Sequence, residues 1–189
     1  MKRHWGNSMP FEIKKKGRKI MGELWDIYDE QRNKTGKIAE RGVTKLQPGE
    51  YHIAIEAMIL NSKGQILISQ RAAHKKYPLM WECNGGSALK DETSVQAILR
   101  EMEEELGLVF REEEAVFLRT HKGDVYFKDY WLFRTDIPAE LVTFPDGEAI
   151  AAKWVTIDEM MEMQEKGEWI GSITREDHKV AMEKLGISI

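Results

Sequence analysis

The order of apolar and polar positions along the chain predicts many short strands and a few helices. Two apolar runs rich in β-branched residues, 53–60 and 65–70, flank a polar turn that contains Gly64, which is typical of a β-hairpin. Other apolar segments predict strands at residues 24–28, 81–84, 115–121, 125–133 and 151–155. The polar segments between them predict turns or loops at residues 29–36, 43–50 and 71–80.

The clearest helix is predicted over residues 93–106. Thr93 and Gln96 fit a capping box at its start, and Gly107 stands where a left-handed C-cap belongs. Its apolar side chains recur three and four residues apart, as in a helix that buries one stripe: Val95, Ile98, Leu99, Met102 and Leu106. Two more helices are predicted at residues 157–165 and 174–185. Strands and helices alternate irregularly, which favours an α+β fold with a mixed sheet.

Length and composition indicate one stable domain. The chain has 189 residues, enough to bury a core without disulfides or a structural metal. Its single cysteine, Cys83, excludes an internal disulfide and a cysteine-based zinc site, and it favours a reducing, cytoplasmic setting. The longest apolar runs are far shorter than the roughly 20 residues of a membrane helix, so we expect no membrane contact.

Charge divides the chain into two parts. Residues 1–20 hold seven Lys or Arg and one acid, which leaves 21 basic and 31 acidic residues in the rest. We therefore predict a flexible basic extension at residues 1–22 and a folded domain at residues 23–189, and we expect activity to survive deletion of residues 1–20. The acidic body argues against general nucleic-acid binding. Such a protein handles phosphates through metal ions or a few placed basic side chains.

Three glutamates on the predicted helix are candidates for metal ligands. Glu101, Glu104 and Glu105 are spaced to project from one face. Like charges at this spacing repel by a few tenths of a kcal/mol, and the helix C-terminus disfavours negative charge. A hard divalent cation such as Mg²⁺ or Mn²⁺ resolves this repulsion. The alternative is a solvated glutamate face, which is the usual meaning of a charge run.

The surrounding residues match a known motif at every position. Gly86 is followed by five residues, Glu92, seven residues, and then Arg100-Glu101-Met102-Glu103-Glu104-Glu105-Leu106-Gly107-Leu108. This is the Nudix box, and a chance match is on the order of one in 10⁷ to 10⁸. The chain thus resembles the Nudix superfamily. The resemblance implies an α/β/α sandwich with a mixed sheet and a loop–helix–loop box. It also implies Mg²⁺- or Mn²⁺-dependent hydrolysis of a diphosphate.

The resemblance assigns roles to residues of the box. Glu101, Glu104 and Glu105, with the carbonyl of Gly85, resemble the metal ligands, and Glu104 is also a predicted catalytic side chain. Arg100 resembles the arginine that orients the catalytic glutamates. Its alternative is an ordinary surface salt bridge.

Other residues are assigned supporting roles. Gly86, Glu92 and Gly107 support the box. Glu148 lies six residues before Trp154, where many members carry a further acid that serves as a ligand or general base. The alternative for Glu148 is a plain loop acid.

A basic loop precedes the box. Arg71, Lys75 and Lys76 could hold a terminal phosphate, as placed cations do, or form a solvated loop.

Outside the box, residues 24–54 resemble the start of isopentenyl-diphosphate isomerases and of related bacterial Nudix hydrolases. The isomerase cysteine is replaced here by Gly85, the following histidine by Ser87, and one of two metal histidines by Lys45; His52 matches the other. These departures and the complete box favour a hydrolase of a small nucleotide or other organic diphosphate. An isomerase and a non-catalytic nucleotide-sensing module are the alternatives.

Two residues outside the proposed site also carry expectations. We expect Cys83 to be partly buried and His52 to be a hydrogen-bonded structural residue. The identity of the substrate and the oligomeric state stay open, although homodimers are common in this family.

Overall fold

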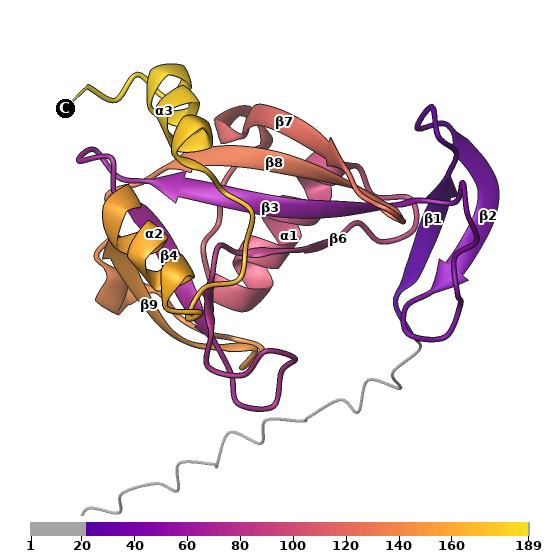
Figure 1. Cartoon of the computed structure of the whole chain (residues 1–189), viewed down its shortest axis with the longest axis horizontal. Helices are drawn as coiled ribbons and strands as arrows, with labels where there is room; N and C mark the ends of the chain where they lie inside the picture. The colour runs from indigo at the N-terminus through magenta and orange to yellow at the C-terminus, as the bar shows by residue number, and fades with distance from the viewer. Residues whose placement is uncertain (1–21, 189) are drawn as a thin grey trace, which may run out of the picture.

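The computed structural model describes residues 22–188. The basic extension predicted for residues 1–22 lies outside the described residues except for Gly22, so it stays a prediction. Within residues 22–188 the chain forms a mixed β-sheet, a separate β-hairpin and three α-helices (Figure 1). None of the helices in this part of the chain is both long and apolar enough to cross a bilayer.

The main sheet is built around β3 (His52–Leu60). On one side β3 pairs in parallel with β8 (Tyr126–Arg134), and β7 (Val116–Lys122) pairs with β8 in antiparallel fashion. The remaining strands of the sheet pair antiparallel on the other side: β4 (Ile66–Arg71), β5 (Trp81–Glu82), β6 (Gly85–Ser87) and β9 (Ala149–Val155). One parallel pair among antiparallel pairs makes the sheet mixed, as predicted.

The second edge of β3 is shared between two strands. β4 pairs with β3 only where Leu60 faces Ile66, so the predicted hairpin is confirmed at its turn and then splays apart. Residues 54–56 of β3 pair with β6 instead. The strand predicted over residues 81–84 ends at Glu82, and Gly85 begins β6. A Cβ at Gly85 would lie 2.5 Å from the Ile55 carbonyl oxygen. Only glycine permits this close backbone approach.

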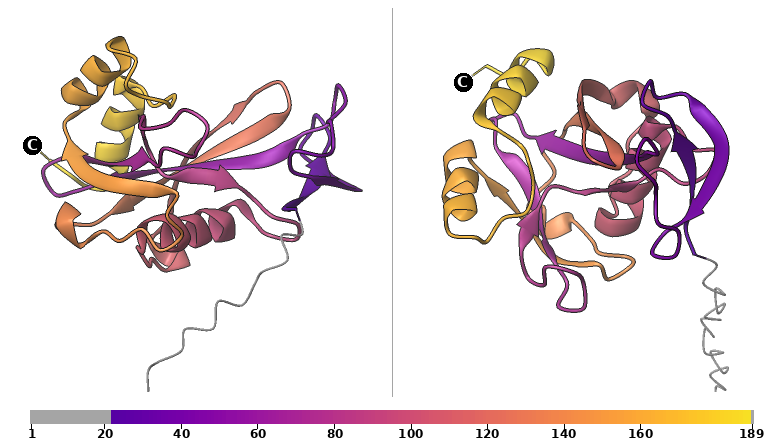
Figure 2. Two further views of the ribbon diagram at one scale, coloured as in Figure 1. Left: turned by 90° about the horizontal axis from the view of Figure 1, so that it is seen from below. Right: turned by 45° about the vertical axis from the view of Figure 1, so that its right-hand side comes forward.

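Helices cover both faces of the sheet (Figure 2). The side chains of β3 alternate between two cores, as the period of a strand requires. Ile55 packs in one core with α1 (Ser94–Leu106). Met58 packs in the other with α2 (Ile157–Glu165) and α3 (Arg175–Lys184). The predicted α/β/α sandwich is therefore confirmed.

The ends of α1 are formed as predicted. The Thr93 side chain accepts from the Gln96 backbone while the Gln96 side chain accepts from Thr93, which completes the capping box. Gly107 adopts a left-handed φ of 63° and ends the helix. A Cβ at Gly107 would lie 2.0 Å from Thr143 Oγ1. The missing side chain thus lets the loop at residues 142–148 pack against the end of α1.

The hairpin of β1 (Leu24–Tyr28) and β2 (Lys34–Glu40) forms its own two-stranded sheet beside the main one (Figure 1). The polar-turn prediction for residues 29–36 was wrong in part, since β2 begins at Lys34. Of the seven residues of β2 only Ala39 is buried. The strand therefore lacks the alternation of apolar and polar residues by which a strand is predicted from sequence.

Candidate active site

Three carboxylates project from the same face of α1, as their spacing predicts. The side chains of Glu101, Glu104 and Glu105 are 14 %, 46 % and 10 % exposed. On the neighbouring face Ile98 and Met102 are fully buried and anchor the helix in the core. A rigid, packed helix therefore presents these acids to one cleft.

The cleft has a volume of about 140 Å³. Nine residues that the sequence singled out line it: Arg71, Lys75, Gly85, Gly86, Arg100, Glu101, Glu104, Glu105 and Glu148. Three residues that sequence reasoning missed also line it: Glu23, Arg41 and Asp146. The box helix, the strand β6, the basic loop, the loop before β9 and the β1–β2 hairpin thus meet at one place.

Arg100 holds several acids of the box together. Its Nε lies 2.8 Å from Glu92, and its Nη1 lies 3.0 Å from both Glu101 and Glu104. Its Nη2 donates to the carbonyl oxygen of Ser87 at 3.1 Å. Burial opposes the charge of Arg100, but these carboxylates outweigh burial and raise its pKa. A planar guanidinium with five donors is suited to fix several carboxylates at once.

Glu105 is the most buried acid of the cleft. Asn84 Nδ2 donates to its Oε2 at 2.7 Å, and Lys75 Nζ lies 3.7 Å from its Oε1. Burial and the nearby charge of Glu101 raise the pKa of Glu105 to about 8, although Lys75 acts in the opposite direction. A carboxyl group that holds its proton this strongly lacks a sufficient positive counter-charge.

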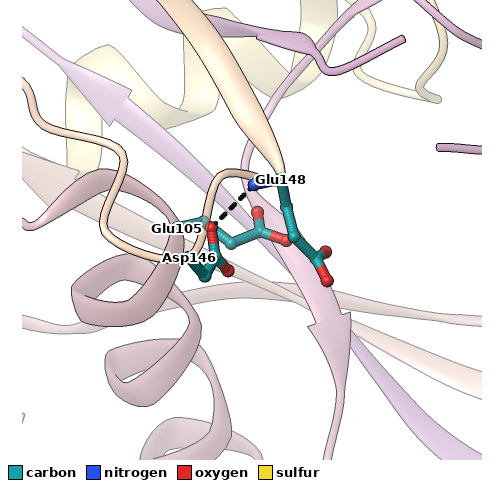
Figure 3. A group of neighbouring side chains, drawn as sticks. All are labelled: Glu105, Asp146 and Glu148. Carbon is teal, nitrogen blue, oxygen red and sulfur yellow. Dashed lines mark hydrogen bonds between the residues drawn. The ribbon is translucent and has the colours of Figure 1, made fainter. Parts of the chain in front are cut away.

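The loop before β9 brings two more acids to Glu105 (Figure 3). One carboxylate oxygen from each of Glu105, Asp146 and Glu148 lies within 4.8 Å of the others. The Glu148 backbone N–H donates to Asp146 Oδ1 at 2.9 Å, which ties the two loop acids together, and Lys75 forms an ion pair with Glu148. Asp146 carried a local signal, because it stands two residues before Glu148 in the same turn.

The donor set fits a hard divalent cation. All the clustered side-chain groups are carboxylates, which Mg²⁺ and Mn²⁺ prefer, and the acids outnumber the cations around them. Gly86 completes the cradle, since a Cβ there would lie 2.3 Å from Glu101 Oε1. A larger residue at this position would push Glu101 out of the cleft.

The basic loop divides into three different environments. Arg71 lines the cleft, but its Nη1 is engaged by both Glu82 oxygens at 2.6 and 2.7 Å. Lys75 reaches the acids of the cleft directly. Lys76 is exposed and its Nζ lies 4.9 Å from the centre of the Tyr77 ring. The structure therefore brings Arg71 and Lys75 to the predicted site but not Lys76.

His52 and Cys83 differ from what we expected. His52 is buried and stacks on Trp25 with ring centres 4.1 Å apart, yet among residues 22–188 its Nδ1 has no hydrogen-bond partner. Burial lowers the pKa of His52 to about 4. Cys83 is not partly but almost fully buried, and burial raises the pKa of its thiol. Neither residue lines the cleft.

Comparison with known proteins identifies the family. The NUDIX domain model matches residues 50–176. An uncharacterized Nudix hydrolase of Listeria monocytogenes is 39 % identical over 150 residues, which cover 78 % of this chain and 88 % of that protein. The CTP pyrophosphohydrolase of Escherichia coli is 30 % identical over 110 residues, 58 % of this chain and 80 % of that protein.

The fold comparison agrees. The crystal structure of DR0079 from Deinococcus radiodurans covers 87 % of this chain and 99 % of its own length, with a TM-score of 0.66 at 20 % identity. At this identity the similarity establishes the fold alone. The family model and the relatives together show that the chain belongs to the Nudix family, as a hydrolase that acts on diphosphate bonds.

Proposed function

We propose that the protein is a divalent-metal-dependent pyrophosphohydrolase that cleaves the diphosphate linkage of a small nucleotide or other organic diphosphate. The observation that carries the proposal is the meeting of the three box glutamates with Asp146 and Glu148 in one cleft. Residues more than 40 positions apart along the chain supply this acid cluster, and basic side chains lie beside it. This arrangement suits an anionic substrate whose phosphate oxygens bind to the acids through a metal cation.

The metal ligands we propose are Glu101, Glu104 and Glu105, with the carbonyl of Gly85. Mg²⁺ or Mn²⁺ bound there supplies charge neutralisation for phosphate oxygens and a more acidic water. Arg100 acts as a positioning residue, since it holds Glu101 and Glu104 in fixed orientations through hydrogen bonds.

Glu148 is the general base in this proposal. Its side chain is 43 % exposed and reaches the cleft from a loop, without contact to Arg100 among the described residues. It can therefore accept a proton from water while α1 stays fixed. In this proposal Lys75, the ion-pair partner of Glu148, holds a phosphate oxygen, and Arg71 lines the same cleft. Lys76 has no part in this proposal.

The isomerase alternative is disfavoured by side chains. Gly85 offers no acid at the position of the isomerase cysteine, and Cys83 is buried outside the cleft with a raised pKa. A sensing module is disfavoured by the complete set of acids. A non-catalytic protein has no need for three glutamates held by Arg100 beside a second acidic loop.

The test is hydrolysis by the full chain with Mg²⁺ on a panel of nucleoside di- and triphosphates, sugar nucleotides, dinucleotides and isoprenoid diphosphates. We expect phosphate or pyrophosphate release that EDTA abolishes. Glu104→Gln should lower it by about 100-fold or more. Glu103→Gln is the matched control, because Glu103 is the exposed neighbour on α1 and does not line the cleft.

Three results would contradict the proposal. Absence of turnover on the whole panel is the first. Conversion of isopentenyl to dimethylallyl diphosphate would instead support the isomerase. A nucleotide that raises Tm strongly without being hydrolysed would support a sensing module.

A further inference from the structure

A second pocket lies across β6 from the acidic cleft. Its volume is about 230 Å³, and the backbone of Gly85 and Gly86 borders both openings. Polar groups come from Glu56 of β3, Glu82 of β5 and Lys128 of β8. Ile55, Cys83 and Ile170 also line the pocket. A few converging polar groups in a partly apolar pocket are typical of a site for a small organic group.

One carboxylate oxygen in this pocket is unpaired. Glu56 is 6 % exposed, and its Oε2 accepts from Lys128 Nζ at 2.9 Å. Its Oε1 is buried and finds no hydrogen-bond donor within residues 22–188. Glu82 differs, because Arg71 engages both of its oxygens. A buried, unpaired carboxylate oxygen is unfavourable and calls for a specific donor.

The pocket lining therefore holds an unpaired, enclosed acceptor beside a donor, and a ligand pairs with this acceptor when the Glu56 carboxylate turns toward the pocket. Glu56 Oε1 accepts, and Lys128 retains two N–H groups beyond the one it gives to Glu56. The complement is the edge of a nitrogen heterocycle, where an N–H stands next to a carbonyl oxygen or ring nitrogen. Nucleobases carry such edges. The volume lies below the roughly 300–1,000 Å³ of pockets for drug-sized ligands, so it suits one ring system.

We propose that this pocket receives the base of a nucleoside di- or triphosphate. A base N–H donates to Glu56 Oε1, and the neighbouring carbonyl or ring nitrogen accepts from Lys128. The shared border at Gly85 and Gly86 lets one molecule place its base here and its phosphates in the cleft. The inference rests on the proposed function and names its substrate class, because an isoprenoid tail has no N–H and leaves Glu56 Oε1 unpaired.

The first test measures binding with the metal removed by EDTA, so that it does not depend on hydrolysis. AMP, CMP, GMP, UMP and ribose 5-phosphate are titrated into the full chain by calorimetry. We expect at least one nucleotide to bind tenfold or more tightly than ribose 5-phosphate. Glu56→Gln should weaken that nucleotide about 10- to 100-fold and leave ribose 5-phosphate unchanged.

The choice of Glu56→Gln follows from the contacts. In this variant Lys128 donates to the new amide oxygen, so the amide nitrogen faces the pocket. Two donors, the amide and the base N–H, then face each other and form no hydrogen bond. The control is Glu162→Gln, the same change on an exposed residue of α2. Should Glu56→Gln fail to fold, the wild-type chain is titrated with its preferred nucleotide carrying an N-methylated base. The same 10- to 100-fold loss of affinity is expected.

The outcomes separate this inference from the proposed function. Equal binding of ribose 5-phosphate and every nucleotide overturns the base pocket, as does unchanged nucleotide affinity in Glu56→Gln or for the N-methylated base. If tripolyphosphate or isopentenyl diphosphate is cleaved as fast as any nucleoside triphosphate, hydrolysis does not depend on the base. That result contradicts the base pocket but is consistent with the proposed hydrolase. Base-dependent binding without any hydrolysis keeps the pocket and overturns the hydrolase.

Discussion

The two openings beside β6 differ in how their charges are arranged. In the acidic cleft, acids outnumber basic groups, and Arg100 and Lys75 each contact several carboxylates. In the pocket across β6, one ion pair between Glu56 and Lys128 leaves a single oxygen unpaired. The cleft is suited to a cation and phosphate, which are common to many substrates. The pocket is suited to one hydrogen-bonding edge, which distinguishes among them.

The two openings are also built from different elements. The cleft takes its acids from α1 and the loop before β9, whereas the polar groups of the pocket come from β3, β5 and β8. Substitutions in the cleft should therefore change the chemistry, and substitutions in the pocket should change recognition of the substrate.

The largest effect is expected from Glu105→Gln. This change removes the most buried acid of the cleft and should lower turnover of every substrate about 100- to 1,000-fold. Glu56→Gln should affect nucleotides alone. Steady-state kinetics on a nucleotide and on tripolyphosphate measure both variants, and Glu103→Gln is the control. If Glu105→Gln lowered turnover of only one substrate class, the cleft would not be common to all substrates.

Arg100→Lys should lower kcat about 10- to 100-fold with a smaller change in KM. Lysine keeps the charge but cannot hold Glu92, Glu101 and Glu104 together, because it lacks the planar fork. Arg111→Lys provides the control, since Arg111 forms only exposed ion pairs. Rescue of full activity by lysine would show that charge alone suffices.

The stability of the metal-free protein should fall as pH rises from about 5 to 8. Because the pKa of Glu105 is raised to about 8, the folded state binds its proton where the unfolded state, with an ordinary pKa near 4.5, has released it. Unfolding thus becomes easier as pH rises through this window. Melting in EDTA should show Tm falling by several degrees. Glu105→Gln should flatten the profile, and a slope unchanged in that variant contradicts the assignment.

The smallest effect is expected from Lys75→Met. Lys75 contacts Glu105 and Glu148 and so competes with a cation for the same carboxylates. Without it, Mg²⁺ affinity measured by titration in the absence of substrate should rise by about fivefold, which corresponds to roughly 1 kcal/mol. Lys76→Met, on the exposed side of the loop, should leave the affinity unchanged. Weaker Mg²⁺ binding in Lys75→Met would indicate that Lys75 organises the acids instead.

The parts of the site that the sequence predicts are those formed by local spacing. Thr93, Gly107 and the glutamates of α1 follow from the period and caps of one helix, and the structure has them in the expected element. The motif also anticipates that Arg100 orients the glutamates, and Glu104 lies one helical turn from it.

The parts that the sequence did not predict depend on tertiary contacts. The pairing of Glu56 with Lys128 depends on β8 lying beside β3, which the sequence does not predict. A lone acid in an apolar strand was nevertheless a signal for a buried charge. Asp146 and Arg41 enter the cleft through loop and hairpin packing. β2 has too few buried residues to form a pattern, and Gly85 forms a strand because its missing side chain allows contact with Ile55.

The two glycines of β6 have a consequence for engineering the specificity of this protein. Gly85 and Gly86 contribute only backbone to both openings; a Cβ at Gly85 would meet the Ile55 carbonyl oxygen, and a Cβ at Gly86 would displace the Glu101 side chain. Substitutions of the pocket residues on β3, β5 and β8 can therefore alter the pocket while this backbone wall is left in place. Two adjacent glycines thereby keep the acids of the cleft apart from substitutions made in the pocket.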